Sequence, residues 1–327
     1  MSRRPSALPA VLGDVFTPEQ ARAAGVSARR LRARDIEHPH RGLLVMTSDR
    51  SQYDVADDAP FARDRAQQEE VRRRALLYRR LMTVNAFFTG RTAAGLWGLP
   101  IDCSGDLEVG VRAPHRAPRR RGIRGRQISP GLVSVREVDG LPVASPASTW
   151  AMLASELPVH DLVRLGDAIV HVPRDQGARR RPELALATME QLRSAADAGP
   201  RPGVNRLREA IEMIRTGSAS PLETDYRMDA AAAGLPDPEL DVEIRDGQGR
   251  LLGVTEIAYR RFRVLVEIEG DHHRTSRDQW RRDIEKYASY VAEGYEVVRL
   301  TSSHIRQKPP TAAARVLEAL SRHGWRP

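Results

Sequence analysis

The chain lacks the residues that redox and membrane functions require. Its one cysteine, Cys103, has no second thiol to pair with, which excludes an intramolecular disulfide and a zinc-finger site. No stretch approaches about 18 consecutive apolar residues, so we predict no membrane-spanning helix and no membrane partner. The basic N-terminus is followed only by a short mixed run, shorter than a secretory signal needs. Together these absences predict a cytoplasmic protein.

Lysine is nearly absent from a chain that is strongly basic. Lysine and arginine number 52 against 43 acidic residues, which gives a net charge of +9, and the isoelectric point is about 10.3. Only Lys286 and Lys308 are lysines, so arginine carries almost all of the positive charge. Forked guanidinium groups suit phosphate binding, which favours DNA, above all double-stranded DNA, as the partner. The alternative is a solvated basic surface without a ligand.

The length of 327 residues exceeds one typical domain. Composition divides the chain into four regions: 1–60, 61–180, 181–215 and 216–327. For the second region the pattern predicts a mixed α+β domain, with helices and strands over residues 63–81, 107–111, 132–136, 141–143, 147–157 and 159–170. The basic, glycine-containing segment 119–126 is expected to be a loop that either follows a nucleic-acid backbone or is only solvated. The third region reads as a helical linker.

The first region has the pattern of a DNA-binding helix pair. Thr17 and Pro18 begin one helix, Gly25 ends it, and Ser27 begins a second helix over residues 28–34. Residues 38–46 then turn into a strand, like a wing. A short helix, a glycine turn and an arginine-bearing second helix predict a helix-turn-helix that enters the major groove. The alternative is a helical hairpin with a solvated arginine face. The predicted DNA contacts here are Arg29, Arg30, Arg32, Arg34 and Arg41.

Residues 17–46, TPEQARAAGVSARRLRARDIEHPHRGLLVM, resemble the small winged helix-turn-helix of AbiEi-type antitoxins and related actinobacterial proteins. Two stretches of the second region, 88–100 and 140–149, are similar to the middle domain of the same proteins. The resemblance implies a DNA-binding regulator and leaves a toxin-type protein partner open. None of these stretches contains a catalytic group of residues.

The last region alternates helices and strands in a legible order. A helix opened by Ser220 and Pro221 is followed by a three-strand meander, a helix, a strand and a closing helix, over residues 220–233, 240–245, 251–259, 263–269, 276–293, 296–300 and 311–323. In the helix that directly follows the meander, residues 276–293, the spacing of Trp280, Ile284, Tyr287 and Val291 predicts one buried stripe. The fold class is therefore mixed α/β throughout.

Carboxylates gather on the third strand of the meander. Glu267 and Glu269 are two residues apart, so they share one face, while Val264, Val266 and Ile268 point the other way, into a core. Neighbouring carboxylates repel each other unless a cation lies between them. Glu256, on the preceding strand, is expected to join them. Hard carboxylate oxygens suit Mg²⁺ or Mn²⁺, and the predicted ligands are Glu256, Glu267 and Glu269.

The string VLVEIEGDHHRTSRDQWRRDIEKYASYVAEGYEVVRLT, residues 264–301, resembles the very-short-patch-repair (Vsr) endonuclease-like family of the PD-(D/E)xK superfamily. The resemblance covers about residues 216–325 and implies a restriction-endonuclease-like fold with a metal-dependent hydrolytic site. It makes Glu223 the helix carboxylate and Glu256 and Glu267 the strand acids. It also makes His272, His273 and Asp271 the candidates for base or ligand. The implied catalytic set is Glu223, Glu256, Glu267, Glu269, His272 and His273, with Arg274 and Arg282 toward DNA.

The chain departs from this family at defined positions. Glu256 and Glu269 stand where the family usually has aspartate, and Glu269 fills the superfamily's lysine position. Vsr-like members also lack that lysine and use histidine, so His272 or His273 would serve here. Structural readings stay open for the same residues: Glu223 as a helix cap, Glu267 and Glu269 in arginine ion pairs, and Asp283 as a partner of Lys286.

Two functions follow from these observations. The first is a DNA-binding, divalent-metal-dependent endonuclease that hydrolyses phosphodiester bonds. The second is a non-catalytic DNA-binding regulator of the antitoxin type, in which the nuclease domain is degenerate. A third reading, RNA processing, is permitted by the basic segment 119–126 and is not argued for by anything else. Metal binding at the carboxylates separates the first two, since a regulator does not need it.

Overall fold

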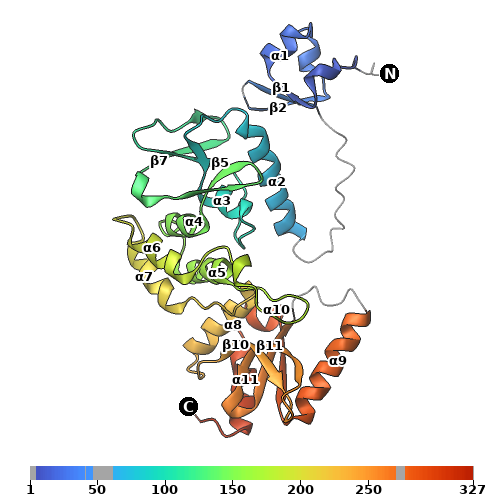
Figure 1. The fold of residues 1–327 in the computed structure, drawn as a ribbon, viewed down its shortest axis with the longest axis vertical. Helices are drawn as coiled ribbons and strands as arrows, with labels where there is room; N and C mark the ends of the chain where they lie inside the picture. The colour runs from blue at the N-terminus through green and yellow to red at the C-terminus, as the bar shows by residue number, and fades with distance from the viewer. Residues whose placement is uncertain (1–4, 41, 47–61, 270–276, 327) are drawn as a thin grey trace. The chain divides into compact units, whose positions relative to one another are not determined.

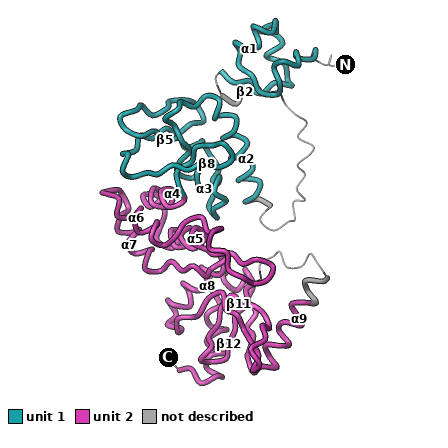
Figure 2. Tube along the Cα trace, in the orientation of Figure 1, with its two compact units in different colours: residues 1–145 teal, residues 146–327 magenta. Residues whose placement is uncertain are grey.

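The structure, a computed structural model, describes residues 5–40, 42–46, 62–269 and 277–326. Contacts divide the chain into two compact units, residues 1–145 and 146–327 (Figure 2). The helices that follow residue 145 therefore belong with the C-terminal part, whereas the sequence grouped them with the middle region. Across the described residues the fold is mixed α/β, as predicted, with helices and three sheets of differing strand orientation (Figure 1).

The first part of unit 1 is a small sheet with one helix. Its elements are η1 (Ala10–Leu12), β1 (Val15–Phe16), α1 (Pro18–Ala23), η2 (Arg30–Arg32), β2 (Ile36–His40) and β3 (Leu43–Met46). The strands pair antiparallel in the order β1-β3-β2. Helix α1 begins as expected: Thr17 and Gln20 form a reciprocal capping box, and Pro18 occupies the first helical position. Phe16, Ala21 and Leu44 are buried in its core.

The predicted second helix over residues 28–34 is wrong. The backbone there makes only the single 3₁₀ turn η2, Arg30–Arg32. Its seven residues offer one large apolar side chain, Leu31, so they have no stripe that could hold a longer helix against the core. Arg30 is instead held in a side-chain network. The wing-like pair of strands, β2 and β3, is present.

The rest of unit 1 is built around a six-stranded mixed sheet. Its elements are α2 (Ala62–Arg79), β4 (Ala86–Phe88), α3 (Gly90–Leu96), β5 (Leu107–Arg112), β6 (Arg119–Arg120), β7 (Ile123–Ile128), η4 (Pro130–Leu132), β8 (Val135–Val138) and β9 (Leu141–Ala144). The strand order is β6-β7-β5-β4-β9-β8. The segment 119–126, expected as a loop, forms the hairpin β6–β7 at one edge of this sheet. The strands predicted near 107–111 and 141–143 are confirmed as β5 and β9.

Unit 2 begins with a helical layer. Its elements are α4 (Pro146–Leu153), α5 (Val159–Val170), η5 (Pro182–Leu184), α6 (Met189–Asp197) and α7 (Val204–Met213). The segment read as a helical linker packs into this layer, because Leu192 of α6 and Leu207 of α7 are fully buried. Trp150 of α4 is buried too, and its indole N–H donates to the carbonyl oxygen of Leu162 at 2.8 Å. These contacts give the layer a core of its own.

A four-stranded sheet forms the rest of unit 2. Its elements are α8 (Pro221–Ala232), β10 (Glu239–Arg245), β11 (Leu251–Tyr259), η6 (Arg260–Phe262), β12 (Val264–Glu269), α9 (Arg277–Ala292), β13 (Glu296–Thr301), α10 (Ser302–Arg306) and α11 (Ala312–Arg322). The strand order is β10-β11-β12-β13. The first three strands form an antiparallel meander, and β13 joins β12 in parallel after α9. This is the predicted order, with α10 as an addition.

Helices cover both faces of this sheet (Figure 1). Helices α8 and α11 pack with Val264, Val266 and Ile268 on one face, while α9 packs with Leu265 on the other. The alternation predicted for β12 is therefore confirmed. The predicted stripe on α9 is wrong at Ile284 and Val291, whose side chains are 46% and 60% exposed. Tyr287 does pack toward the sheet, and the side chain of Trp280 lies outside the part of the chain that is described. The helix turns Lys286, Tyr287 and Tyr290 toward the sheet instead.

Candidate carboxylate site

The candidate site lies where strands β11 and β12 separate. Their ladder runs from Tyr259 opposite Val264 to Ile257 opposite Val266. The next step of this register places Glu256 opposite Glu267, on the same face of the sheet. There the backbone pairing has ended, and Oε2 of Glu256 accepts the Ile268 N–H at 2.6 Å. A side-chain carboxylate thus takes the place of a strand partner and is held beside Glu267.

Glu267 is a buried carboxylate with one satisfied oxygen. Glu267 is 5% exposed, and its Oε2 lies 3.0 Å from Nζ of Lys286 on α9. Nζ also donates to the carbonyl oxygen of Val254 at 3.1 Å. The other oxygen, Oε1, is buried and has no hydrogen-bond partner among the residues that the structure describes. Burial raises the pKa of Glu267, and the ammonium group of Lys286 opposes that rise.

Glu223 both caps a helix and carries a charge into the site. Its backbone N–H donates to Oγ of Ser220 at 3.2 Å, and its Oε2 accepts the Ala219 N–H at 2.8 Å. Ser220 is therefore the N-cap of α8. The capping box that the spacing suggests is only half formed, because the Glu223 side chain takes the N–H of Ala219 and not that of Ser220. The residue is 3% exposed, and burial raises the pKa of its carboxyl to about 7. Its charge raises the pKa of Glu256, so Glu223 belongs to the site as well as to the helix start.

Glu256 is the point at which the three carboxyls interact. Burial, and then the charges of Glu223 and Glu267, hold the pKa of Glu256 well above its ordinary value. The three groups therefore resist being ionised together, although Lys286 neutralises one charge. Binding of a proton or of a cation reduces the repulsion in such a cluster and stabilises it. This behaviour is expected of a site for a hard metal ion.

The donor set fits a divalent cation in its chemistry but is incomplete as it stands. Carboxylate oxygens are the ligands that Mg²⁺ and Mn²⁺ prefer, and the unpaired Oε1 of Glu267 is a buried acceptor. Within residues 5–40, 42–46, 62–269 and 277–326, however, no group of three or more His, Cys, Asp or Glu side chains is arranged to hold a metal ion. Glu256 and Glu267 are the residues that would supply the ligands here.

The remaining predicted residues lie apart from this pair or outside the described chain. Glu269 forms an ion pair with Arg299 of β13, so its predicted role as a third ligand gains no support. Arg282, on α9, is exposed. The predicted base and DNA-contact residues that follow β12 lie outside the described residues; they are Asp271, His272, His273 and Arg274.

The lysine is the functional candidate that sequence reasoning missed. The sequence places no lysine on the strand of Glu267 and offers Lys286 only as one possible partner of Asp283. The structure instead brings Lys286 to Glu267 from the following helix. The composition contains a signal for this residue. Only two of the 52 basic residues are lysine, so a lysine in this chain is a candidate for a role that arginine does not fill.

A glycine permits this lysine to approach the sheet. A Cβ atom on Gly253 of β11 would lie 2.5 Å from the hydroxyl oxygen of Tyr290 and 3.0 Å from Cγ of Lys286. Nζ of Lys286 lies 5.3 Å from the ring centroid of Tyr287 and 5.7 Å from that of Tyr290. The two aromatic rings thus flank the ammonium group while Gly253 leaves room beneath it.

Buried charges also tie α8 to α5 and so fix the position of Glu223. Asp167 of α5 is 1% exposed, and its Oδ2 accepts from Oγ1 of Thr224 and from a guanidinium nitrogen of Arg227, each at 2.8 Å. Its Oδ1 accepts the Arg215 N–H at 2.8 Å. Arg164 pairs with Asp225 at the same interface. The helix that carries Glu223 is therefore held to α5 by the residues that directly follow Glu223.

The arginines predicted to bind DNA in the first part of the chain divide into two kinds. Arg30 donates to both carboxylate oxygens of Asp35, at 2.8 and 2.7 Å, and to the Ser6 carbonyl oxygen at 2.6 Å. This fork lowers the pKa of Asp35 and makes Arg30 a structural brace rather than a phosphate contact. Exposed side chains remain at Arg29, Arg32 and Arg34. Arg41 lies outside the described residues.

Comparisons with known proteins give relatives but no activity. No protein-family model matches the chain. The uncharacterized proteins MT2308 and Rv2248, from two strains of Mycobacterium tuberculosis, are each 24% identical over 250 residues, which is 74% of this chain and 86% of theirs. The crystal structure of the RV2827C protein of Mycobacterium tuberculosis matches 71% of this chain and 78% of its own, at 16% identity and a TM-score of 0.37. Among the described residues, no helix is both long enough and apolar enough to span a bilayer.

Proposed function

We propose that the protein is a DNA-binding, divalent-metal-dependent endonuclease that hydrolyses phosphodiester bonds. One observation carries the proposal: Glu256 and Glu267 are held side by side at the point where two strands separate, with Lys286 donating to Glu267. A buried carboxylate pair with a lysine beside it is costly as architecture alone. It is useful where a phosphate, a cation and a water must be positioned together.

Each residue has a definite part in this proposal. Glu256 and Glu267 would hold Mg²⁺ or Mn²⁺, which supplies Lewis-acid stabilisation of negative charge on the phosphate. Lys286 fixes the orientation of the Glu267 carboxylate and places a positive charge beside it. Glu223, with its pKa near 7, keeps a proton available within the cluster at neutral pH. His272 and His273, outside the described residues, stay candidates for activating water.

The DNA-binding part of the proposal rests on charge. The net charge of +9 is carried almost wholly by arginine, and Arg29, Arg32 and Arg34 are exposed beside the strand pair β2–β3. Exposed guanidinium groups supply phosphate contacts that position a duplex without reading its sequence. Because residues 28–34 form only the short turn η2, we expect residues 5–46 to bind the DNA backbone and not to read bases in the major groove.

The experiment that tests the proposal combines cleavage with metal binding. Purified protein is titrated with Mg²⁺ and Mn²⁺ in the presence of plasmid and of mismatched duplex, and nicking is followed beside binding. We expect Glu267→Ala to abolish cleavage while DNA binding persists. Glu269→Gln is the matched control, since Glu269 pairs with Arg299, and it should retain cleavage. If Glu267→Ala cleaved DNA at the wild-type rate, the assignment of Glu267 to an endonuclease site would be wrong.

A second function is favoured by a separate observation. Lys286 already neutralises Glu267, and the described residues contain no three-ligand metal group. Both facts suit a non-catalytic DNA-binding regulator whose nuclease-like domain is a scaffold, with a toxin-type protein as a further partner. For such a protein the same titration would show DNA binding that is indifferent to metal and equal in wild type and Glu267→Ala.

A further inference from the structure

Most of the net charge of the chain comes from one segment. Residues 109–136 contain eight arginines and neither aspartate nor glutamate. Their formal charge of +8 compares with +9 for all 327 residues, so the rest of the chain is nearly balanced. A concentration of one sign on this scale creates a local potential that attracts a polyanion.

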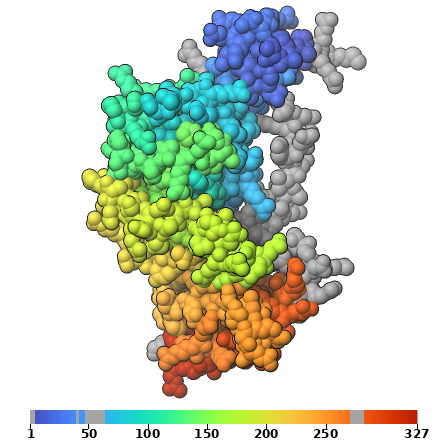
Figure 3. Space-filling view, in the orientation of Figure 1, coloured from blue at the N-terminus to red at the C-terminus, as the bar shows by residue number. Residues whose placement is uncertain are grey.

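The fold places the middle of this segment, the hairpin β6–β7, at one edge of the sheet of unit 1, whereas Arg136 lies on β8 at the opposite edge. The hairpin β6–β7 is the edge, and β7 runs parallel to β5, with Arg124 opposite Glu108 and Ile128 opposite Arg112. In the space-filling view the green atoms of this part of the chain lie at the surface of unit 1 (Figure 3). The exposed arginines of the segment are Arg112, Arg116, Arg119, Arg120, Arg121, Arg124 and Arg136.

The hairpin holds like charges close together. Arg119 and Arg124 are direct cross-strand partners, so the hairpin brings two arginines to neighbouring positions. Gly125 of β7 lies so close to Pro118 that only glycine fits there, since a Cβ atom would lie 2.1 Å from the carbonyl oxygen of Pro118. The nearby carboxylate, Glu108, is 4% exposed and pairs with Arg126 at 3.4 Å. It offsets the charge of Arg126, so the charge at the surface comes from the exposed arginines of the segment.

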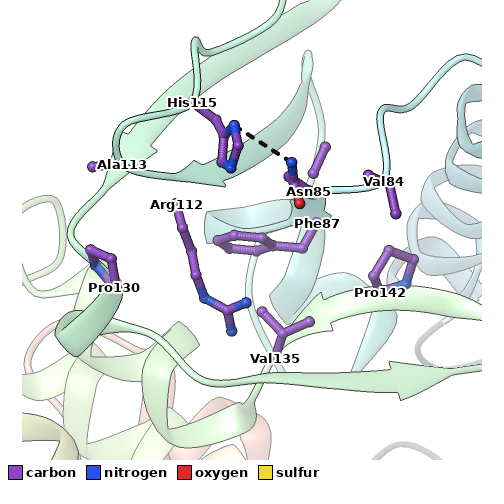
Figure 4. A pocket seen from close by; sticks show the side chains of 10 residues that line it. Val84, Asn85, Phe87, Arg112, Ala113, His115, Pro130, Val135 and Pro142 are labelled. Atoms are coloured by element: carbon purple, nitrogen blue, oxygen red, sulfur yellow. Dashed lines mark hydrogen bonds between the residues drawn. The ribbon is translucent and has the colours of Figure 1, made fainter.

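A cavity continues the basic surface at the far end of β5. It has a volume of about 310 Å³ and is lined by Asn85, Phe87, Arg112 and His115, among others (Figure 4). Cζ of Arg112 lies 5.9 Å from the centroid of the Phe87 ring, which holds the guanidinium at the cavity. At a strand rise of about 3.3 Å, the four steps from Arg124 to Ile128 span about 13 Å. The arginines therefore form a strip rather than a single point.

The composition of the segment decides the kind of nucleic acid. Residues 109–136 contain no phenylalanine, tyrosine or tryptophan, and proteins that bind single strands rely on exposed aromatic rings for base stacking. Phe87, beside the cavity, is only 2% exposed. A two-stranded ribbon with exposed arginines instead suits the backbone of a duplex.

We propose that the β6–β7 hairpin, with the adjoining loop through His115 and Arg116, is a second DNA-contact surface that binds the phosphate backbone of double-stranded DNA. It is separate in sequence from the arginines of residues 29–34 and from the carboxylate site. The inference shares with the proposed function the premise that DNA is the ligand, and it does not require that the carboxylates be catalytic.

Full-length protein carries the test. The variant Arg116→Gln/Arg119→Gln/Arg121→Gln removes three exposed charges, and Arg79→Gln/Arg193→Gln/Arg208→Gln is a control that removes three exposed charges elsewhere. Affinity for a labelled duplex and for the matching single strand is measured by fluorescence anisotropy across a series of salt concentrations. A third variant replaces the same hairpin residues with lysine and keeps the charge.

The hairpin variant should bind the duplex roughly 10- to 100-fold more weakly at low salt, and its log–log salt slope should be shallower by about 0.9 for each lost phosphate contact. The lysine variant should keep the wild-type slope. Equal slopes in hairpin and control variants would overturn the proposal, as would a loss confined to single-stranded DNA or a wild type that does not bind duplex at all. Single-turnover cleavage at saturating protein separates the two ideas, since a hairpin variant that binds weakly but cleaves normally once bound leaves the carboxylate site intact.

Discussion

Lys286 and Glu267 form an ion pair between a helix and the strand that precedes it, with Nζ and Oε2 3.0 Å apart. The superfamily that the sequence resembles places its lysine on the strand itself, two residues after the acid. Here Glu269 fills that position and the positive charge arrives from α9. The pair is largely buried, with side chains 22% and 7% exposed, so each partner depends on the other for its charge.

Replacing Lys286 with methionine should expose this dependence. The variant leaves the Glu267 carboxylate buried without its cation, which we expect to lower the free energy of unfolding by about 2–4 kcal/mol at pH 8. At pH 5 the loss should shrink, because Glu267, whose pKa burial already raises, takes up a proton instead. Denaturant unfolding at the two pH values measures the difference. Lys308→Met, at the other, exposed lysine, is the control, and an equal loss at both pH values would contradict the ion-pair account.

Glu223 should make the protein less stable as the pH rises. Its pKa in the fold, about 7, lies above the ordinary glutamate value of about 4.3. A raised pKa gives stability that is fully present below the unfolded value and is lost as the pH passes the folded one. Glu223→Gln removes this titration and can still accept the Ala219 N–H. Relative to wild type it should therefore gain on the order of 2–3 kcal/mol between pH 4.5 and pH 8.5.

The comparison needs a glutamate that lies outside the buried carboxylate cluster. Glu209 is exposed on α7, and Glu209→Gln should differ from wild type by the same amount at every pH. Thermal or chemical unfolding of the three proteins between pH 4.5 and pH 8.5 gives the two difference curves. A flat curve for Glu223→Gln would show that its carboxyl is ionised throughout this range.

Gly253→Ala should disturb the site without touching a charged group. The new methyl would lie 2.5 Å from the Tyr290 hydroxyl oxygen, so α9 must shift and carry Lys286 away from Glu267. We expect a loss of about 1–3 kcal/mol in unfolding free energy, together with weaker cleavage if the endonuclease proposal holds. Gly247→Ala, in the β10–β11 turn where a Cβ would meet nothing within 4 Å, should have little effect. Equal stability of the two variants would show that α9 is not packed against Gly253 in solution.

The sequence predicted the C-terminal sheet because its signals are local. Alternation along residues 264–269 separates Glu267 from the valines beside it, and the turn at Asp246 and Gly247 separates two strands. The same local signals place Glu256 and Glu267 on adjacent strands. The helix cap at Glu223 was also visible, because Ser220 stands three residues before it.

What could not be predicted depends on contacts between distant residues. The face of α9 that packs on the sheet is the one on which Lys286 meets Glu267 and Tyr290 approaches Gly253. The spacing of apolar residues alone predicts the face that contains Ile284 and Val291. Arg30 was counted as a DNA contact because nothing local shows that Asp35 and the Ser6 carbonyl surround it. The hairpin β6–β7 was expected as a loop, since its arginines gave no alternation to indicate a strand.

Substitution by glutamine should lower stability at Arg30 and weaken DNA binding at Arg32, although the two residues are only two positions apart. Arg30 is forked onto Asp35 with a side chain only 10% exposed, so Arg30→Gln should lower the unfolding free energy of the first part of the chain by about 1–3 kcal/mol. Arg32 is exposed, so Arg32→Gln should leave stability unchanged and weaken binding to duplex DNA, with a salt slope shallower by about 0.9. Proteolysis within residues 5–46 and anisotropy at several salt concentrations measure the two effects. If Arg30→Gln were to weaken DNA binding without increasing proteolysis, Arg30 would be a phosphate contact after all, and its bond to Asp35 would have to open when DNA binds.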